Sequence, residues 1–265
     1  MIEKILVALS DLMGAISKIR LPLMLGWQDI KQRYRRSRLG PFWLTISMGI
    51  MITMIGYIFG QAMGLPRQEY LPFVATGMIF WGFISSSINE GSSSFINDAG
   101  MIRQLSLPLS IYPLRTLWRN VVVLGHNLIL LPIALMVASR TLNFNFFWIL
   151  PGFVLLVLNI FWISVFLGVI CTRYRDLPPI IGSLIQVFFY VTPIIWMPSS
   201  STARVPSWIL DFNPAYHLLE LVRAPVLGYC PSLLSWSVAL VSVVVGALVT
   251  LIFYGTYKKR IAYWV

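Results

Sequence analysis

Six apolar runs, each long enough to cross a lipid bilayer, dominate this sequence. The hydrocarbon core is ~30 Å thick, and a helix crosses it with about 20 apolar residues. We place the runs at residues 42–63, 71–93, 110–138, 146–171, 178–197 and 232–257. Hydrophobic residues make up 58% of the 265-residue chain and charged residues only 11%, outside the range of a soluble domain. The sequence therefore predicts an all-α integral membrane protein with six transmembrane helices.

The basic residues fall mainly on one side of these runs. Of the 20 Lys and Arg, only Arg67, Arg140, Arg204 and Arg223 belong to the other side. Cytoplasmic loops carry an excess of Lys and Arg, so both termini are expected in the cytoplasm. Membrane topology thus accounts for the net charge of +11, and no nucleic-acid partner is expected.

A cluster of five cations precedes the first run and must stay at a headgroup surface, because an arginine at the bilayer centre costs about 2.5–3.5 kcal/mol. The cluster consists of Lys31, Arg33, Arg35, Arg36 and Arg38. Trp27, Ile30 and Tyr34 recur at helical spacing among them, which predicts an amphipathic helix in the inner interface. A solvated charge run that only enforces topology is the alternative. Residues 39–41, Leu-Gly-Pro, then form a candidate hinge.

The second run becomes polar toward its inner end, where residues 85–94 are mostly serine. Such small residues favour close helix packing, and lining of an aqueous path is the alternative. Glu90, the one acidic residue within the runs, is expected at the interface or in an ion pair, with a functional intramembrane carboxylate as the alternative. Residues 97–108 mix apolar and charged side chains, which suits either a soluble partner or a plain helix connector.

The outer segment before the last run is too apolar for a plain loop. We predict two short helices, at 207–210 and 216–227, that enter the outer leaflet and return, because twelve residues are too few for a crossing. Glu220 and Arg223 are spaced to pair on the second helix. Re-entrant backbone is tolerated only where protein buries it or it lines a cavity, so this hairpin is expected at a pathway mouth.

We expect one transmembrane domain over residues 1–265. Its predicted parts are a cytoplasmic N-terminal region at 1–41, five spans within 42–197, the outer hairpin at 198–231, the last span at 232–257 and a cytoplasmic tail at 258–265.

Sequence motifs for hydrolytic or metal chemistry are absent. The chain has no Gly-x-x-x-x-Gly-Lys-Ser/Thr phosphate loop, so we expect no ATP hydrolysis by that route. It has no H-E-x-x-H motif, and the two histidines, His126 and His217, are far apart, so neither a metal site nor a catalytic triad is expected. A proton-coupled carrier usually needs several buried ionisable groups, and Glu90 alone gives little support. An enzyme acting on polyprenyl lipids would need a convergent acidic set that the sequence does not suggest.

Three stretches together resemble one family, the membrane subunits of type-2 ABC exporters that move O-antigen or capsular polysaccharide. The first, residues 33–43, is similar to the family's interface helix and to the loop that leads into its first span. The second, residues 102–108, is similar to the segment that rests on the ATPase. The third is similar to the fifth span and outer gate, and comprises residues 174–177, 192–194 and 213–214 with Glu220 and Arg223.

The resemblance implies that two copies of the chain form one channel and bind two copies of a separate ATPase, which would hold ATP and Mg²⁺. The chain itself would need no cofactor. The cargo would be a glycan on undecaprenyl diphosphate, crossing the bacterial inner membrane among its lipids. A permease of the same superfamily for a drug or a teichoic-acid polymer is the alternative.

The resemblance also assigns site residues. The inner entrance and gate would be formed by Arg35, Arg36, Arg38, Leu39 and Gly40, with the arginines admitting the diphosphate. Contact with the ATPase would involve Asp98, Gly100, Met101, Ile102, Arg103 and Gln104. The outer gate would include Asn213, Pro214, Glu220 and Arg223. For the channel aromatics, which would hold sugar faces without a fixed hydrogen-bond pattern, we select Phe42, Trp43, Tyr57, Phe188, Tyr190 and Trp196.

Overall fold

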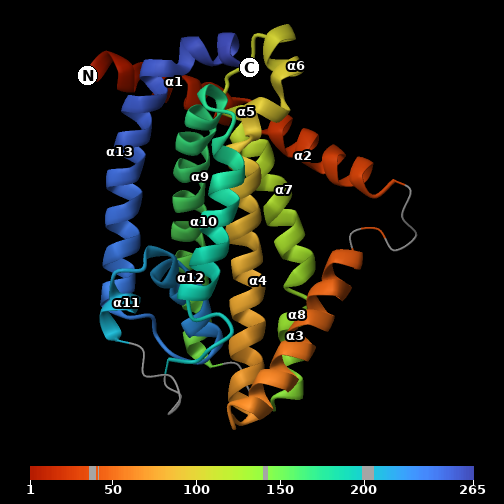
Figure 1. The fold of residues 1–265 in the computed structure, drawn as a ribbon. Helices are drawn as coiled ribbons and strands as arrows, with labels where there is room; N and C mark the ends of the chain where they lie inside the picture. The colour runs from red at the N-terminus through yellow and green to blue at the C-terminus, as the bar shows by residue number, and fades with distance from the viewer. Residues whose placement is uncertain (36–39, 41, 140–142, 199–205) are drawn as a thin grey trace.

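The computed structural model describes residues 1–35, 40, 42–139, 143–198 and 206–265, and the regular secondary structure of these residues is helical, with no strand among them. Five helical stretches are long and apolar enough to cross a membrane, and they run along the length of the molecule (Figure 1). They are α3 (Phe42–Ala62), α4 (Arg67–Ser92), α7 with α8 (Ile111–Val137), η1 with α9 (Phe144–Arg173) and α13 (Leu233–Trp264). Within them, α7 ends at Asn127 and α8 covers Leu130–Val137, while η1 covers Phe144–Trp148 and α9 covers Ile149–Arg173. The predicted all-helical membrane class is confirmed.

The predicted fifth span differs from the other five. Its helix, α10 (Leu177–Val191), has 15 residues, fewer than the ~20 that a perpendicular crossing needs. The helix stops because Pro193 follows, and the residue before a proline is disfavoured in helical geometry. Thr192 accordingly has an extended backbone. The predicted run at 178–197 is therefore a short helix followed by an irregular segment.

Two helices precede the first long one. α1 (Ile2–Ser17) packs against α13, and α2 (Arg20–Arg33) packs against α7 (Figure 1). α2 begins at Arg20, and Pro22 lies within its first turn. Proline is tolerated there because the first-turn N–H groups have no partner within the helix.

Both termini lie at one end of the molecule, which we call the inner end (Figure 1). Two short helices, α5 (Ser94–Asn97) and α6 (Ala99–Gln104), lie there as well. α13 does not end at residue 257, where the sequence predicted the start of a tail, but continues to Trp264. α11 (Ser207–Asp211) and α12 (Pro214–Val226) lie toward the opposite end, which we call the outer end. Their bounds agree to within two residues with the short helices predicted at 207–210 and 216–227.

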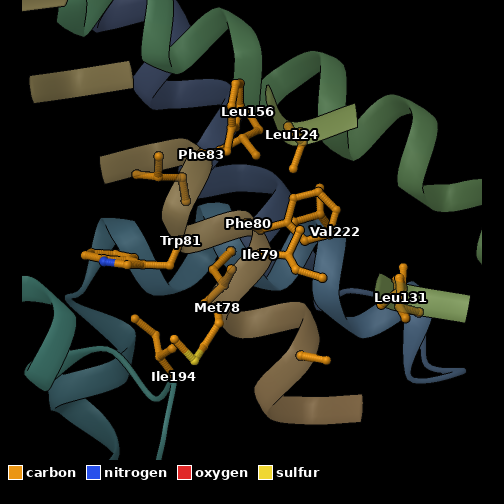
Figure 2. Packing of buried hydrophobic residues seen from close by; sticks show 14 of the residues in the cluster. Met78, Ile79, Phe80, Trp81, Phe83, Leu124, Leu131, Leu156, Ile194 and Val222 are labelled. Carbon is orange, nitrogen blue, oxygen red and sulfur yellow. The ribbon is translucent and has the colours of Figure 1, made fainter. Parts of the chain in front are cut away.

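α4 is the central helix of the fold. Of the residues in an apolar 18-residue stretch of α4, 72% are buried, whereas 17% are buried in the corresponding stretches of α3 and α13. Its residues 78–83 contact side chains from α7, α9 and α12, including Leu124, Leu156 and Val222 (Figure 2). Lipid tails are as apolar as these side chains, so helices in a membrane associate through close packing. Gly91 of α4 allows such close packing against α9, because an added Cβ would lie 2.3 Å from the Ser164 hydroxyl oxygen.

Candidate functional site

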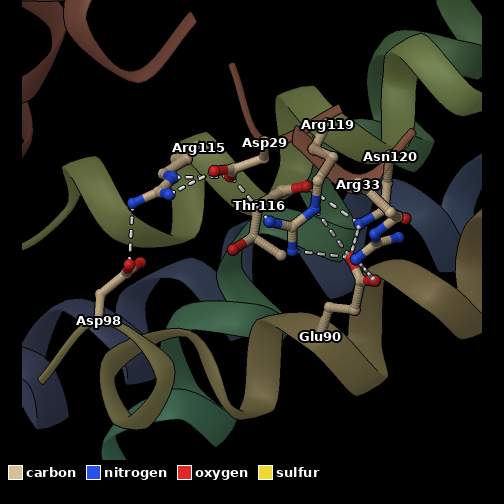
Figure 3. A network of polar contacts seen from close by, with 8 residues as sticks. All are labelled: Asp29, Arg33, Glu90, Asp98, Arg115, Thr116, Arg119 and Asn120. Atoms are coloured by element: carbon tan, nitrogen blue, oxygen red, sulfur yellow. Dashed lines mark hydrogen bonds and ion pairs between the residues drawn. The ribbon is translucent and has the colours of Figure 1, made fainter. Parts of the chain in front are cut away.

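Three acidic and three basic side chains form an ion-pair network near the inner end of the molecule (Figure 3). They come from α2, the end of α4, the residue before α6, and α7. The members are Asp29, Arg33, Glu90, Asp98, Arg115 and Arg119. The network therefore links helices that are far apart in the sequence, and its formal charges balance.

Asp29 lies at the centre of the network. Its two carboxylate oxygens accept hydrogen bonds from Arg115, whose Nε lies 2.8 Å from Oδ2, and from Arg119, whose Nη1 lies 2.9 Å from Oδ2. Burial alone would raise the pKa of Asp29, but the two guanidinium groups outweigh it and lower the pKa. The carboxylate thus holds α2 against α7. Close packing assists, because a Cβ on Gly26 of α2 would lie 3.0 Å from the Arg115 carbonyl oxygen.

Glu90 is in an ion pair, as one of the sequence alternatives predicted. Its Oε2 lies 2.9 Å from Nη2 of Arg119 and 2.8 Å from Nδ2 of Asn120, both on α7. Its Oε1 lies 3.3 Å from Nη2 of Arg33, the last residue of α2. The carboxylate is partly buried, and such donors offset the cost of removing its charge from water. Glu90 therefore joins α4 to α2 and α7.

Asp98 connects α6 to the network. Its Oδ1 lies 2.8 Å from Nη1 of Arg115, and the residue immediately precedes α6. Burial is the largest influence on the Asp98 carboxyl and raises its pKa, despite the opposing effect of Arg115. Arg115 thus bridges Asp98 on one side and Asp29 on the other, which connects the start of α6 to α7 and α2.

The other residues predicted to contact the ATPase differ in how exposed they are. Gly100, Arg103 and Gln104 are exposed on α6, and Met101 is partly exposed. Ile102 is buried, and belongs with Phe95 and Tyr112 to an apolar cluster at the inner end. α6 therefore has one buried face and one exposed face at the inner end.

At the outer end, Arg223 of α12 has only 2% of its surface exposed. Its Nη1 donates to the Pro193 carbonyl oxygen at 2.5 Å, its Nη2 lies 2.6 Å from Oε2 of Glu220, and its guanidinium group lies 4.3 Å from the ring centroid of Phe73. The predicted pairing of Glu220 with Arg223 is confirmed. Arg223 in addition anchors the irregular segment after α10.

Two more side chains hold this segment. The Tyr70 hydroxyl donates to the Ile195 carbonyl oxygen at 2.5 Å, and Nδ2 of Asn213 donates to the Thr192 hydroxyl at 3.0 Å. Asn213 also caps α12, because its Oδ1 accepts from the N–H groups of Ala215 and Tyr216. Pro214 begins the helix, a position that suits proline. Arg223 and Tyr70 thus satisfy backbone carbonyl groups beyond the end of α10, and Asn213 ties the Thr192 side chain to the start of α12.

Five of the six selected aromatic residues lie on α3 and α10, which both pack against α4, and Trp196 lies in the segment after α10. Phe42, Trp43 and Tyr57 are exposed on α3, and Phe188 and Tyr190 are exposed on α10. The indole of Trp196 donates to the Tyr190 carbonyl oxygen at 3.0 Å.

Part of the predicted inner entrance lies outside the described residues, namely Arg36, Arg38 and Leu39. Arg35 is exposed just after α2. Gly40 has a φ of +57°, a left-handed conformation that glycine adopts at little cost and other residues rarely adopt. This supports a turn at the predicted hinge.

Asp29, Arg115 and Arg119 were not among the sequence-predicted site residues. Their spacing carries a signal, because Arg115 and Arg119 are four residues apart and Asp29 and Arg33 are also four apart. Residues at this spacing share one helix face. Each pair therefore places its two charges on one side of its helix. Spacing alone does not identify the partners, since Asp29 pairs with α7 whereas Arg33 pairs with Glu90 of α4.

Fold and site together define a membrane-spanning helical subunit whose charged network connects a surface element at the inner end to the helices that cross. A sequence model of the ABC-2 type transporter family matches residues 23–227, and the chain belongs to this family. Relatives include an O-antigen export system permease protein of Klebsiella pneumoniae, 30% identical over 71% of this chain and 72% of its own length. A polysialic acid transport protein of Escherichia coli is 22% identical over 84% of this chain and 86% of its own length.

Proposed function

We propose that this chain is the channel-forming permease of an ATP-driven exporter, which moves O-antigen or capsular polysaccharide linked to undecaprenyl diphosphate across the bacterial inner membrane. Membership of the ABC-2 type transporter family, and relatives that are an O-antigen export permease and a polysialic acid transport protein, support this cargo class. Two copies of the chain would enclose the channel. Two copies of a separate ATPase, which bind ATP and Mg²⁺, would supply the energy.

The connection of α6 to the network is the observation that carries this proposal. In an ATP-driven exporter, a subunit with no phosphate-loop motif would receive its energy from a partner ATPase, and α6 offers an exposed face at the inner end. Asp98 and Arg115 join that element to α7 and α2, and Arg119 extends the connection to Glu90 on α4. A push on α6 by the ATPase would therefore reach three helices through adjoining ion pairs.

The inner end would face the cytoplasm, with both termini inside. α10 and the segment at 192–197 would together complete a sixth crossing. α2 would lie in the inner interface, and Arg35, Arg36 and Arg38 would attract the lipid diphosphate at about 1 kcal/mol each. Leu39 and Gly40 would form the gate there.

α11 and α12 would form a re-entrant outer gate. The hydrogen bonds of Arg223 and Tyr70 to backbone carbonyls of the segment after α10 support this arrangement, because backbone that enters a membrane without helical pairing needs protein donors. The exposed aromatic residues of α3 and α10 would then line the path between the two chains.

Copurification with an ATPase tests the proposal directly. The tagged chain is expressed in its native host in cells that lack the native copy, and the copurifying proteins, the surface polysaccharide and ATP turnover are measured. We expect a complex of two permeases and two ATPases, with export lost when the phosphate-loop lysine of the ATPase is replaced. Export that continues without ATP hydrolysis would instead identify a proton-coupled carrier. An intact complex that exports only a drug or a teichoic-acid polymer would overturn the proposed cargo.

A further inference from the structure

A second polar cluster at the inner end is separate from the ion-pair network and centres on Asp11 of α1. Asp11 has 3% of its surface exposed, which is unusual for a carboxylate. It accepts hydrogen bonds from four groups and forms one ion pair. The donors are the N–H of Leu109 at 3.1 Å, the N–H and hydroxyl of Ser110 at 2.8 and 2.7 Å, the hydroxyl of Tyr254 at 2.7 Å, and Nζ of Lys258 at 2.8 Å.

These donors come from two places in the fold. Leu109 and Ser110 lie in the segment that leads from α6 into α7, and Tyr254 and Lys258 lie on the inner part of α13. Burial alone would raise the pKa of Asp11, but the hydrogen bonds from Lys258, Tyr254 and Ser110 together lower it. The carboxylate is therefore charged at neutral pH, and its attraction holds three elements together.

Close contact between α1 and α13 brings Asp11 to this position. Gly255 faces α1 so closely that an added Cβ would lie 1.9 Å from the Lys4 carbonyl oxygen. Ala8 and Ala15 lie on the same face of α1 as Asp11 and are also buried. Small residues on both helices thus allow the backbone approach that a short aspartate side chain needs.

The same part of α13 also reaches α6. The guanidinium group of Arg103, near the end of α6, donates to the Val265 carbonyl oxygen through Nε at 3.0 Å and through Nη2. α6 is consequently held on two sides, by Arg115 at its start and by α1 and α13 at and beyond its end. α1 and α13 both lie outside residues 23–227, where the family match falls.

We propose that Asp11 is a positioning residue that locks the segment between α6 and α7 to α1 and α13, so that a displacement of α6 moves the last long helix together with α2, α4 and α7. The proposal rests on the assignment of α6 as the ATPase contact. Asp11 sets where α6 sits, and the network around Asp29 transmits its movement in the other direction. Without Asp11, the ATPase would still bind and hydrolyse ATP, but less of each stroke would reach α13.

Export per ATP hydrolysed distinguishes this role from a purely structural one. We compare Asp11→Asn and Lys258→Met with Lys258→Arg, which keeps the ion pair, and with two matched controls, Glu3→Gln on α1 and Lys259→Met on α13, whose side chains are exposed. Export per ATP should fall about 2- to 30-fold in the first two variants, the range for changes within a coupled network. Lys258→Arg and both controls should stay at the wild-type ratio.

Lower subunit abundance with an unchanged ratio in both Asp11→Asn and Lys258→Met would overturn the proposal, as would wild-type behaviour of both variants. A second measurement is independent of the ATPase. Amide hydrogen exchange at Leu109 and Ser110 should accelerate in Asp11→Asn and not in Glu3→Gln. If the wild-type chain binds no ATPase, the proposed function fails while this exchange result still tests whether Asp11 holds the segment.

Discussion

At the scale of single residues, Asp29 and Asp98 show that two partners of the same arginine can have opposite energetic roles. Both pair with Arg115, yet the pKa of Asp29 is lowered and that of Asp98 is raised. A lowered pKa means that the folded protein favours the ionised carboxylate, so its charge adds stability at neutral pH. A raised pKa means that the folded protein favours the protonated form, so its charge costs stability there.

Asp29→Asn should therefore destabilise the subunit more than Asp98→Asn at pH 7. Removing the Asp29 charge leaves two guanidinium groups short of acceptors, at a cost of about 1–3 kcal/mol. Apparent melting temperatures of the purified subunit in detergent measure the difference. The Asp29 contribution is fully present above its ordinary pKa of 3.8 and should shrink as the pH falls below it. Equal melting temperatures for the two variants at pH 7 would contradict this assignment.

Residue-scale features were only partly predictable from the sequence. Glu90 was expected in an ion pair or at the interface because a lone carboxylate in an apolar run needs a partner. Its partner Arg119 lies 29 residues away, a distance in sequence that no local pattern connects. Asp11 interrupts an apolar helix in the sequence, but its donors on α13 lie more than two hundred residues away. Such pairings depend on how the helices pack, which spacing does not specify.

At the scale of elements, the segment after α10 is held by side chains and not by a helix. Helix positions 207–211 and 214–226 were predictable to within a few residues from apolar content and the Asn-Pro start. The end of α10 was not predictable from hydrophobicity, because the sequence stays apolar through Ile194 and Ile195 although the helix has already ended. Pro193 gave the signal, and its consequence is that Arg223 must pair with a carbonyl group that the helix has left free.

Arg223→Gln should release this segment. The charged hydrogen bond to the Pro193 carbonyl contributes roughly 1.5–3 kcal/mol, so exposure of the segment should rise about tenfold or more. The fully buried Ile194 provides the reporter, as Ile194→Cys in a Cys230→Ser background, labelled by a membrane-impermeant maleimide in intact cells. Arg67→Gln is the control. It removes an exposed arginine at the start of α4 and should leave labelling unchanged. Slow labelling in Arg223→Gln would show that other contacts hold the segment.

At the scale of the whole molecule, the exposed surface is mostly apolar helix, which suits both lipid and a second copy of the chain. α3 and α13 are equally exposed, so exposure alone does not separate a lipid face from a channel face. α3 and α10 both carry exposed aromatic rings, among them Tyr57 and Tyr190. A sugar ring packs against an aromatic face without a fixed hydrogen-bond pattern, which suits a long polymer that must keep moving.

Tyr57→Ala and Tyr190→Ala should lower polysaccharide export while ATP hydrolysis and the amount of complex stay near wild type. Each ring removed from a channel wall deletes one stacking contact worth about 0.5–1.5 kcal/mol, so export should fall about 2- to 10-fold per substitution. Phe144→Ala is the matched control, because this ring is highly exposed but belongs to neither α3 nor α10. Export that falls equally in all three variants would point to a general effect of surface aromatics at the membrane. Export that is unchanged in both tyrosine variants would exclude α3 and α10 as channel walls, because a path lined by those helices brings the cargo past both rings.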